Sequence, residues 1–144
     1  MVFSGERDRV SELAAGLKVK TSWLRVSHAF HSPLMDPMLK DFQAVLDTLT
    51  WHEPRIPIVS TLTAQVAGPE MASPEYWVRQ LREPVDFASA VARLEELGAT
   101  TLVEAGPDAA LTTAAQYTCS PQVSTVALLR GRDRPESSDV MTAL

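Results

Sequence analysis

The stretch TTLVEAGPDAALTTAAQYTCSPQVSTVALL, residues 100–129, decides the fold class. It begins with an apolar run over residues 100–106 that ends at Gly106-Pro107, an ending typical of a strand that leads into a turn. Residues 108–116 then have the pattern of a short helix, and 124–129 form a second apolar run. Strand, glycine turn, helix and strand predict a parallel unit, because parallel strands need a crossover connection.

The residues before this unit also alternate between helical and extended patterns. The helix patterns predict starts at Ser73-Pro74, with a break at Pro84, and at either Ser32-Pro33 or Asp36-Pro37. Helices are expected at 6–17, 35–49, 74–83 and 85–97 with a glycine cap at 98, and strands at 2–5, 21–27 and 56–63. The expected class is therefore α/β with a mostly parallel sheet.

Composition limits the kinds of protein this chain can be. With 144 residues, 45% of them apolar, it can bury one sizeable core. The net charge of -5 offers no broad basic surface for nucleic acid, and no apolar run approaches the roughly 20 residues that span a bilayer. The charge and the run lengths therefore predict a protein that binds neither nucleic acid nor membrane. The single cysteine, Cys119, cannot close an internal disulfide, so we expect a cytoplasmic protein.

Two of the three histidines, His28 and His31, follow the strand expected at 21–27. Open α/β sheets bind ligands at the carboxyl ends of their strands, and histidine, with an ordinary pKa of about 6.5, can act as a general base there. Either ring could equally be a hydrogen-bonded loop residue. A metal site with Asp36 is weakly supported by the spacing, so we expect no bound metal.

The remaining candidates for chemistry have simpler readings. The chain contains no G-x-S-x-G nucleophile elbow, and Ser27 and Ser32 lack its glycine setting, so a base at His31 would need a nucleophile from elsewhere. Glu104 is read as a solvated strand end or as a buried carboxylate with a shifted pKa. An aromatic and aliphatic stripe is expected to form core; its members are Tyr76, Trp77, Val78, Leu81 and Phe87.

Four motifs together resemble one family, the acyltransferase domain of modular type I polyketide synthases, which is related to the malonyl-CoA:acyl-carrier-protein transacylases. The motifs are RVSHAFHSPLM at 25–35, PIVSTLT at 57–63, PEYWVRQLREPV at 74–85 and EAGP at 104–107. They occur in the family's order and span nearly the whole chain.

The resemblance implies a two-step acyl transfer. A serine would take an extender unit from coenzyme A and pass it to the phosphopantetheine thiol of an acyl carrier protein, with no tightly bound cofactor. His31 matches the family's catalytic histidine and would carry the protons in both steps. A main-chain carbonyl in the loop matching Arg82-Glu83-Pro84 orients that imidazole in the family, so the resemblance assigns Glu83 an orienting role.

The resemblance also implies a substrate preference. The family positions matching His28-Ala29-Phe30-His31 vary with the extender unit, and this form is similar to the malonyl type, whereas methylmalonyl domains usually have Tyr-Ala-Ser-His. Phe30 would fill the space that a serine leaves for the methyl group, although one methyl group separates substrates by only about 1–3 kcal/mol.

The family's domain is about twice as long as this chain, and its first half holds the serine. The resemblance therefore implies the C-terminal portion of a large α/β-hydrolase-like subdomain at 21–130, after the end of a ferredoxin-like subdomain at 1–20 and before a linker at 131–144. The expected partners are the carrier protein, the N-terminal half of the domain and the flanking synthase domains. Alone, the chain is expected to be inactive. The alternative is a non-catalytic scaffold module that completes its fold with a partner chain.

Overall fold

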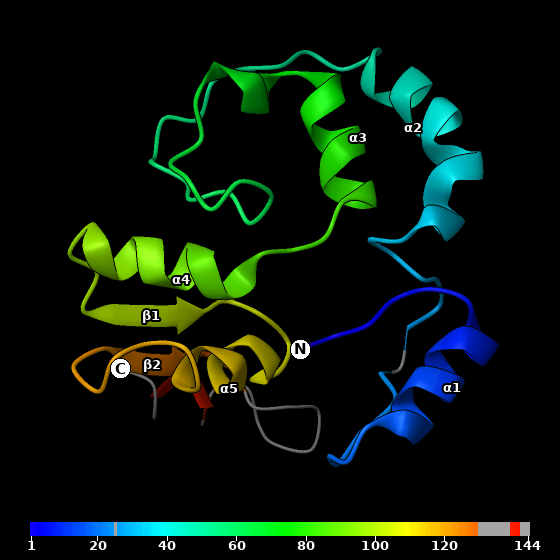
Figure 1. Ribbon diagram of the computed structural model, residues 1–144. Coiled ribbons are helices and arrows are strands. Elements are labelled where there is room, and N and C mark those ends of the chain that lie inside the picture. Colours follow the sequence, from blue (N-terminus) through cyan, green and yellow to red (C-terminus); the bar gives the residue numbers. More distant parts are fainter. Residues whose placement is uncertain (25, 130–138, 142–144) are drawn as a thin grey trace. The chain divides into compact units, whose positions relative to one another are not determined.

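The computed structural model describes residues 1–24, 26–129 and 139–141 (Figure 1). Contacts divide the chain into two compact units, Met1–Ile58 with Val66–Val85, and Val59–Gln65 with Asp86–Leu144. The elements in chain order are α1 (Arg7–Gly16), the 3₁₀ helix η1 (Pro33–Met38), α2 (Leu39–Leu46), the 3₁₀ helix η2 (Pro69–Ala72), α3 (Pro74–Arg82), α4 (Phe87–Glu96), β1 (Thr101–Glu104), α5 (Ala110–Gln116) and β2 (Ser124–Ala127).

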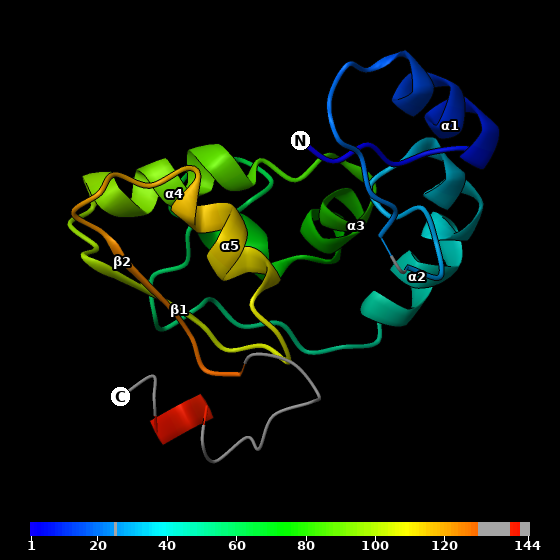
Figure 2. The same cartoon turned by 90° about the horizontal axis from the view of Figure 1, so that it is seen from below.

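The second unit contains the parallel strand pair predicted from residues 100–129. β1 and β2 are parallel, with Thr101 opposite Ser124 and Glu104 opposite Ala127. α5 connects the strands and contacts both of them (Figure 2). A crossover helix packed on a parallel pair is the unit from which α/β folds are built, so the predicted fold class is confirmed.

The first unit is helical around a small core. α3 contacts α2, η1 and η2 (Figure 1). The Trp51 and Trp77 rings stack at 6.1 Å between centroids, and Tyr76 meets Trp77 edge-on at 5.3 Å. Each indole N–H donates to a main-chain carbonyl, Trp51 to Leu46 and Trp77 to Met71, so these half-buried rings leave neither indole N–H unpaired.

Helix boundaries follow the local signals. The Ser73 hydroxyl accepts a hydrogen bond from the Tyr76 N–H at the start of α3, and Ser32 does the same for Leu34 at the start of η1. Ser32-Pro33 is therefore the start of the 3₁₀ helix η1, and neither of the two predicted starts begins the α-helix, which starts at Leu39. α4 ends before Gly98, whose φ of +91° needs a residue without a Cβ.

Three predicted strands are wrong. The described residues of 2–5 and 21–27 lie in no strand, and Trp23 and Leu24 are about three-fifths exposed. At 56–63 a tight turn forms instead, closed by main-chain bonds from Ser60 N–H to Gln65 O and from Ala67 N–H to Ile58 O. β-branched and aromatic residues favour a strand only when a neighbouring strand pairs with their backbone. Among the described residues of these segments, only an isolated bridge between Val59 and Val66 forms, and none of the three segments joins the β1–β2 sheet.

The predicted helix over 35–49 is also divided. Residues 33–38 form a 3₁₀ turn with Pro37 inside it, and the α-helix begins only at Leu39, because proline supplies no N–H to an α-helical ladder. The expected linker at 131–144 lies outside the described residues, except for 139–141. Within the described ranges, no helix is long and apolar enough to cross a bilayer.

Candidate active site

His31 stands in a strained turn between residues 27–30 and η1. Its φ of +60° places it in the left-handed region, which costs a non-glycine residue on the order of 1–3 kcal/mol. Its N–H donates to the Leu81 carbonyl near the C-terminus of α3, at 3.1 Å. The strain is therefore held by contacts with a segment fifty residues away in sequence.

The imidazole has a defined tautomer because of its partner. Nδ1 of the half-buried His31 lies 2.9 Å from the main-chain oxygen of Glu83. A carbonyl oxygen can only accept, so Nδ1 carries the hydrogen, and in the neutral ring the lone pair is on Nε2. No described residue forms a hydrogen bond with Nε2. The ring can thus take up a proton at Nε2 without breaking the bond that orients it.

The three residues before His31 differ in exposure and contacts. The exposed His28 ring has Nδ1 2.9 Å from the Ser27 hydroxyl, and it lies 5.8 Å from the Phe30 ring at a 60° tilt. Phe30 is 41% exposed, and its carbonyl accepts a hydrogen bond from the Ser4 hydroxyl at 2.6 Å. Ala29 is half-buried and accepts from the Ser32 hydroxyl. Apolar surface at Phe30 is therefore available next to the His28 ring, one residue before His31 in the chain.

Two ion pairs surround the end of α3 that holds His31. Arg82 bonds through Nε to Asp36 of η1, across 46 residues of sequence. One turn earlier, Arg79 bonds to the Glu83 carboxylate at 2.8 Å and 3.3 Å. The Arg79 hydrogen bond lowers the pKa of Glu83, and the same bond raises the pKa of Arg79. Opposite charges four residues apart on a helix indicate an ion pair, so the Arg79–Glu83 contact can be predicted from the sequence. No such spacing indicates the Asp36–Arg82 contact.

Metal binding and a local serine nucleophile receive no support from this geometry. In the described part of the chain, no three histidine, cysteine, aspartate or glutamate side chains are placed to hold a metal ion. Asp36, considered as a ligand with His28 and His31, is instead paired with Arg82. The buried Ser32 hydroxyl donates to Ala29 O and accepts from Leu34 N–H, which makes it a helix cap.

Glu104, at the carboxyl end of β1, is half-buried and anchors α5. Its carboxylate accepts from the Leu111 and Thr112 N–H groups and from the Thr112 hydroxyl, at 2.7–3.1 Å. Partial burial raises the pKa of this carboxyl, but the three hydrogen bonds outweigh the burial and the pKa is lowered. The carboxylate is thus ionised and holds the start of α5. It is neither a fully solvated strand end nor a fully buried carboxylate, the two alternatives expected from the sequence.

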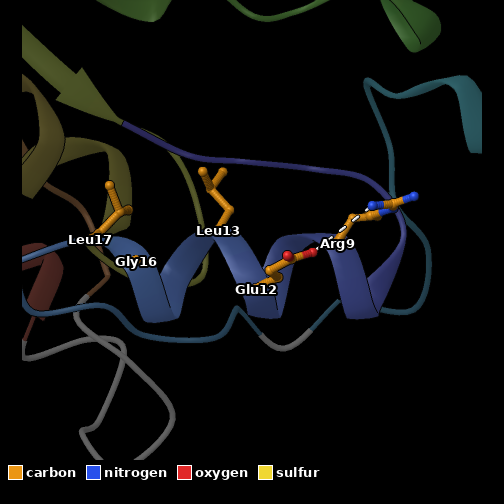
Figure 3. Close-up of a pocket in the computed structure, with 5 residues that line it drawn as sticks. All are labelled: Arg9, Glu12, Leu13, Gly16 and Leu17. Atoms are coloured by element: carbon orange, nitrogen blue, oxygen red, sulfur yellow. Dashed lines mark ion pairs between the residues drawn. The ribbon is translucent and has the colours of Figure 1, made fainter.

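A shallow hollow follows α1 and is distinct in its lining from the His31 site. It is lined by Arg9, Glu12, Leu13, Gly16 and Leu17. Figure 3 shows Leu13 and Leu17 on one side of the helix and the Arg9–Glu12 ion pair on another. That ion pair is 3.9 Å long and about four-fifths exposed at both ends, so the hollow offers weak and solvated contacts.

The fold and the motifs define the class of protein. The acyl transferase domain family matches residues 1–144, and the chain belongs to that family. The predicted family is therefore confirmed.

Individual proteins of known sequence or structure are also similar to the chain. It is 50% identical over 119 residues to the polyketide synthase GfsA of Streptomyces halstedii, an alignment that covers 81% of this chain and 2% of that protein. It superposes with a TM-score of 0.86 and 42% identity on the acyltransferase domain from the second module of the salinomycin polyketide synthase, over 96% of this chain and 33% of that one. It is also similar to the malonyl-transacylase of a type II polyketide synthase, solved with its acyl-carrier protein, with a TM-score of 0.77, 28% identity and coverage of 97% and 44%. The chain thus spans about a third to under a half of these solved structures.

Proposed function

We propose that this chain supplies the acid–base histidine of a domain that transfers a malonyl unit from malonyl-CoA to the phosphopantetheine thiol of an acyl carrier protein. The nucleophilic serine belongs to residues that are not among these 144. The observation that carries the proposal is the contact between His31 Nδ1 and Glu83 O, because it leaves Nε2 as a fixed proton acceptor.

The proton cycle needs only this nitrogen. Nε2 removes the hydroxyl proton as the serine oxygen attacks the thioester carbonyl, and it gives that proton to the departing coenzyme A sulfur. The carrier protein's thiol then loses its proton to Nε2 as its sulfur attacks the acyl-serine. The same proton returns to the serine oxygen when that bond breaks. Glu83 O keeps the ring oriented in both steps.

Substrate choice in this proposal involves His28, Ala29 and Phe30. Phe30 directly precedes the base in the chain, and its ring is 41% exposed and lies 5.8 Å from the His28 ring. We assign the ring to the wall that the malonyl C2 carbon faces. A methyl group at C2 then meets the ring, so malonyl is preferred over methylmalonyl.

The partners follow from the same reaction. The malonyl-transacylase neighbour is described in complex with its acyl-carrier protein, and we extend that partnership to this chain, together with the rest of the acyltransferase domain and the flanking synthase domains. The proposal needs no tightly bound cofactor or metal, and it includes the cytoplasmic location expected from the sequence. The division into 1–20, 21–130 and 131–144 stays a prediction.

The test is His31→Ala in the complete acyltransferase protein. General acid–base catalysis contributes about 10²–10⁴-fold, so the rate of malonyl-serine formation, followed by mass spectrometry of the intact protein, should fall by at least about 100-fold. His52→Ala is the matched control, since His52 is an exposed histidine outside the site. Near-normal loading by the His31 variant would overturn the proposal.

A further inference from the structure

The Asp36–Arg82 ion pair connects the two segments that hold the candidate base. We propose that this pair positions the His31 imidazole, an inference that rests on the proposed function and assigns a positioning role to two residues that act through the histidine. Asp36 lies in η1, which begins two residues after His31, and Arg82 is the last residue of α3.

Three bonds join these segments within a few residues of one another. The His31 N–H donates to Leu81 O, the His31 ring donates from Nδ1 to Glu83 O, and Arg82 lies between those two carbonyls in the chain and bonds to Asp36. A shift of Arg82 therefore moves both acceptors of His31 together. The ion pair is the only side-chain to side-chain bond of the three.

The backbone at His31 makes this third bond important. The left-handed conformation of a histidine persists only where surrounding contacts enforce it. Both enforcing acceptors are main-chain carbonyls at the end of a helix, where the last carbonyls have no helical partner and the backbone frays. The ion pair ties that helix end to the turn it must hold.

The Asp36–Arg82 pair is partly exposed to solvent, so its effect on the orientation of the ring can be measured apart from its effect on global stability. The Arg82 side chain is 30% exposed and the Asp36 side chain is 56% exposed. An ion pair this accessible to water contributes little to global stability. Loss of the pair should therefore leave the fold intact, so that a change in kcat reports the orientation of the ring.

The experiment uses Asp36→Asn, Arg82→Gln and the double variant in the complete acyltransferase protein. Because misplacing a catalytic group by about 1 Å can cost 10²-fold, kcat per titratable active serine should fall about 10- to 100-fold, while KM for malonyl-CoA stays within about twofold. The double variant should fall no further than either single variant, since both remove the same bond. Asp36→Glu, which keeps the carboxylate, should restore kcat to within about threefold of the parent.

The matched control is Glu96→Gln, which cuts the Arg93–Glu96 ion pair of the second unit at 2.8 Å and should leave kcat unchanged. His31→Ala is measured in parallel, because near-normal loading by that variant would contradict the proposed function itself and not only the positioning role. If His31→Ala abolishes loading while Asp36→Asn and Arg82→Gln keep parental kcat, the positioning role is wrong and the proposed function stands. A lower melting temperature and fewer titratable sites, with unchanged kcat per site, would also overturn it, because the pair would then be purely structural.

Discussion

At the scale of single residues, the site depends on one nitrogen being free and the other being occupied. Glu83 O fixes the hydrogen on Nδ1 of His31, and the partly exposed ring can exchange a proton at Nε2. Glu83 contributes through its main chain, so its carboxylate can bond to Arg79 at the same time. A substitution of the Glu83 side chain therefore tests a different contact from a substitution of His31.

Phe30 provides the residue-scale prediction. Phe30→Ser removes a ring that is 41% exposed, and in the proposed site this opens space for a methyl group at C2. One methyl group in an apolar pocket changes specificity by about 10- to 200-fold, so the ratio of kcat/KM for methylmalonyl-CoA to that for malonyl-CoA should rise by a factor in this range. Competition between the two thioesters, read as acyl-serine masses, measures the ratio. Leu49→Ser, at an exposed apolar position after α2, is the control, and an unchanged ratio in Phe30→Ser would contradict the wall assignment.

At the scale of elements, the sequence predicts those helices and strands whose ends are determined by residues within the segment itself. α3, α4 and the β1–α5–β2 unit follow from caps, glycines and apolar spacing that lie within each segment. The strands expected at 21–27 and 56–63 did not form, because a strand depends on a partner that its own residues cannot specify.

The candidate site likewise has features that the sequence predicts and a long-range contact that it does not. The position of His31 and the family resemblance both predict its role, whereas the orienting carbonyl in 82–84 is predicted by the resemblance alone. The Asp36–Arg82 pair joins residues 46 positions apart, and no periodicity connects them.

Glu104 carries the element-scale prediction. Glu104→Gln replaces an ionised acceptor of three hydrogen bonds to α5, and the free energy of unfolding should fall by about 1–2 kcal/mol at pH 7. The pKa of this carboxyl is lower in the folded chain than its usual 4.5, so as the pH falls below about 4.5 the unfolded state binds the proton first. The stabilisation is therefore present above that pH and is lost as the pH falls through the folded-state pKa. Urea unfolding between pH 3 and 7 should show the parent approaching the variant at the acid end, and a constant difference across this range would contradict the assignment.

At the scale of the whole molecule, much apolar surface faces solvent. Trp23, Leu24, Val26, Ile56 and Val103 are each between 56% and 77% exposed. Single exposed apolar residues are common in folded proteins, but many large ones on 144 residues favour association with another surface. We therefore expect the 144-residue chain by itself to self-associate in sedimentation velocity, and a compact monomer across a range of concentrations would contradict this.

The same exposed surface predicts the outcome of reconstitution. The chain mixed with malonyl-CoA alone should form no acyl-enzyme, because it has no G-x-S-x-G serine. Mixed with a second polypeptide carrying the rest of the acyltransferase domain, it should bind through its apolar surface, place His31 Nε2 against the serine and give a malonyl-serine adduct in the mass spectrum of the second polypeptide. The His31→Ala chain should bind equally well and give no adduct, which separates assembly from proton transfer. Stable binding of the parent chain without any adduct would instead identify a scaffold that completes a fold and contributes no base.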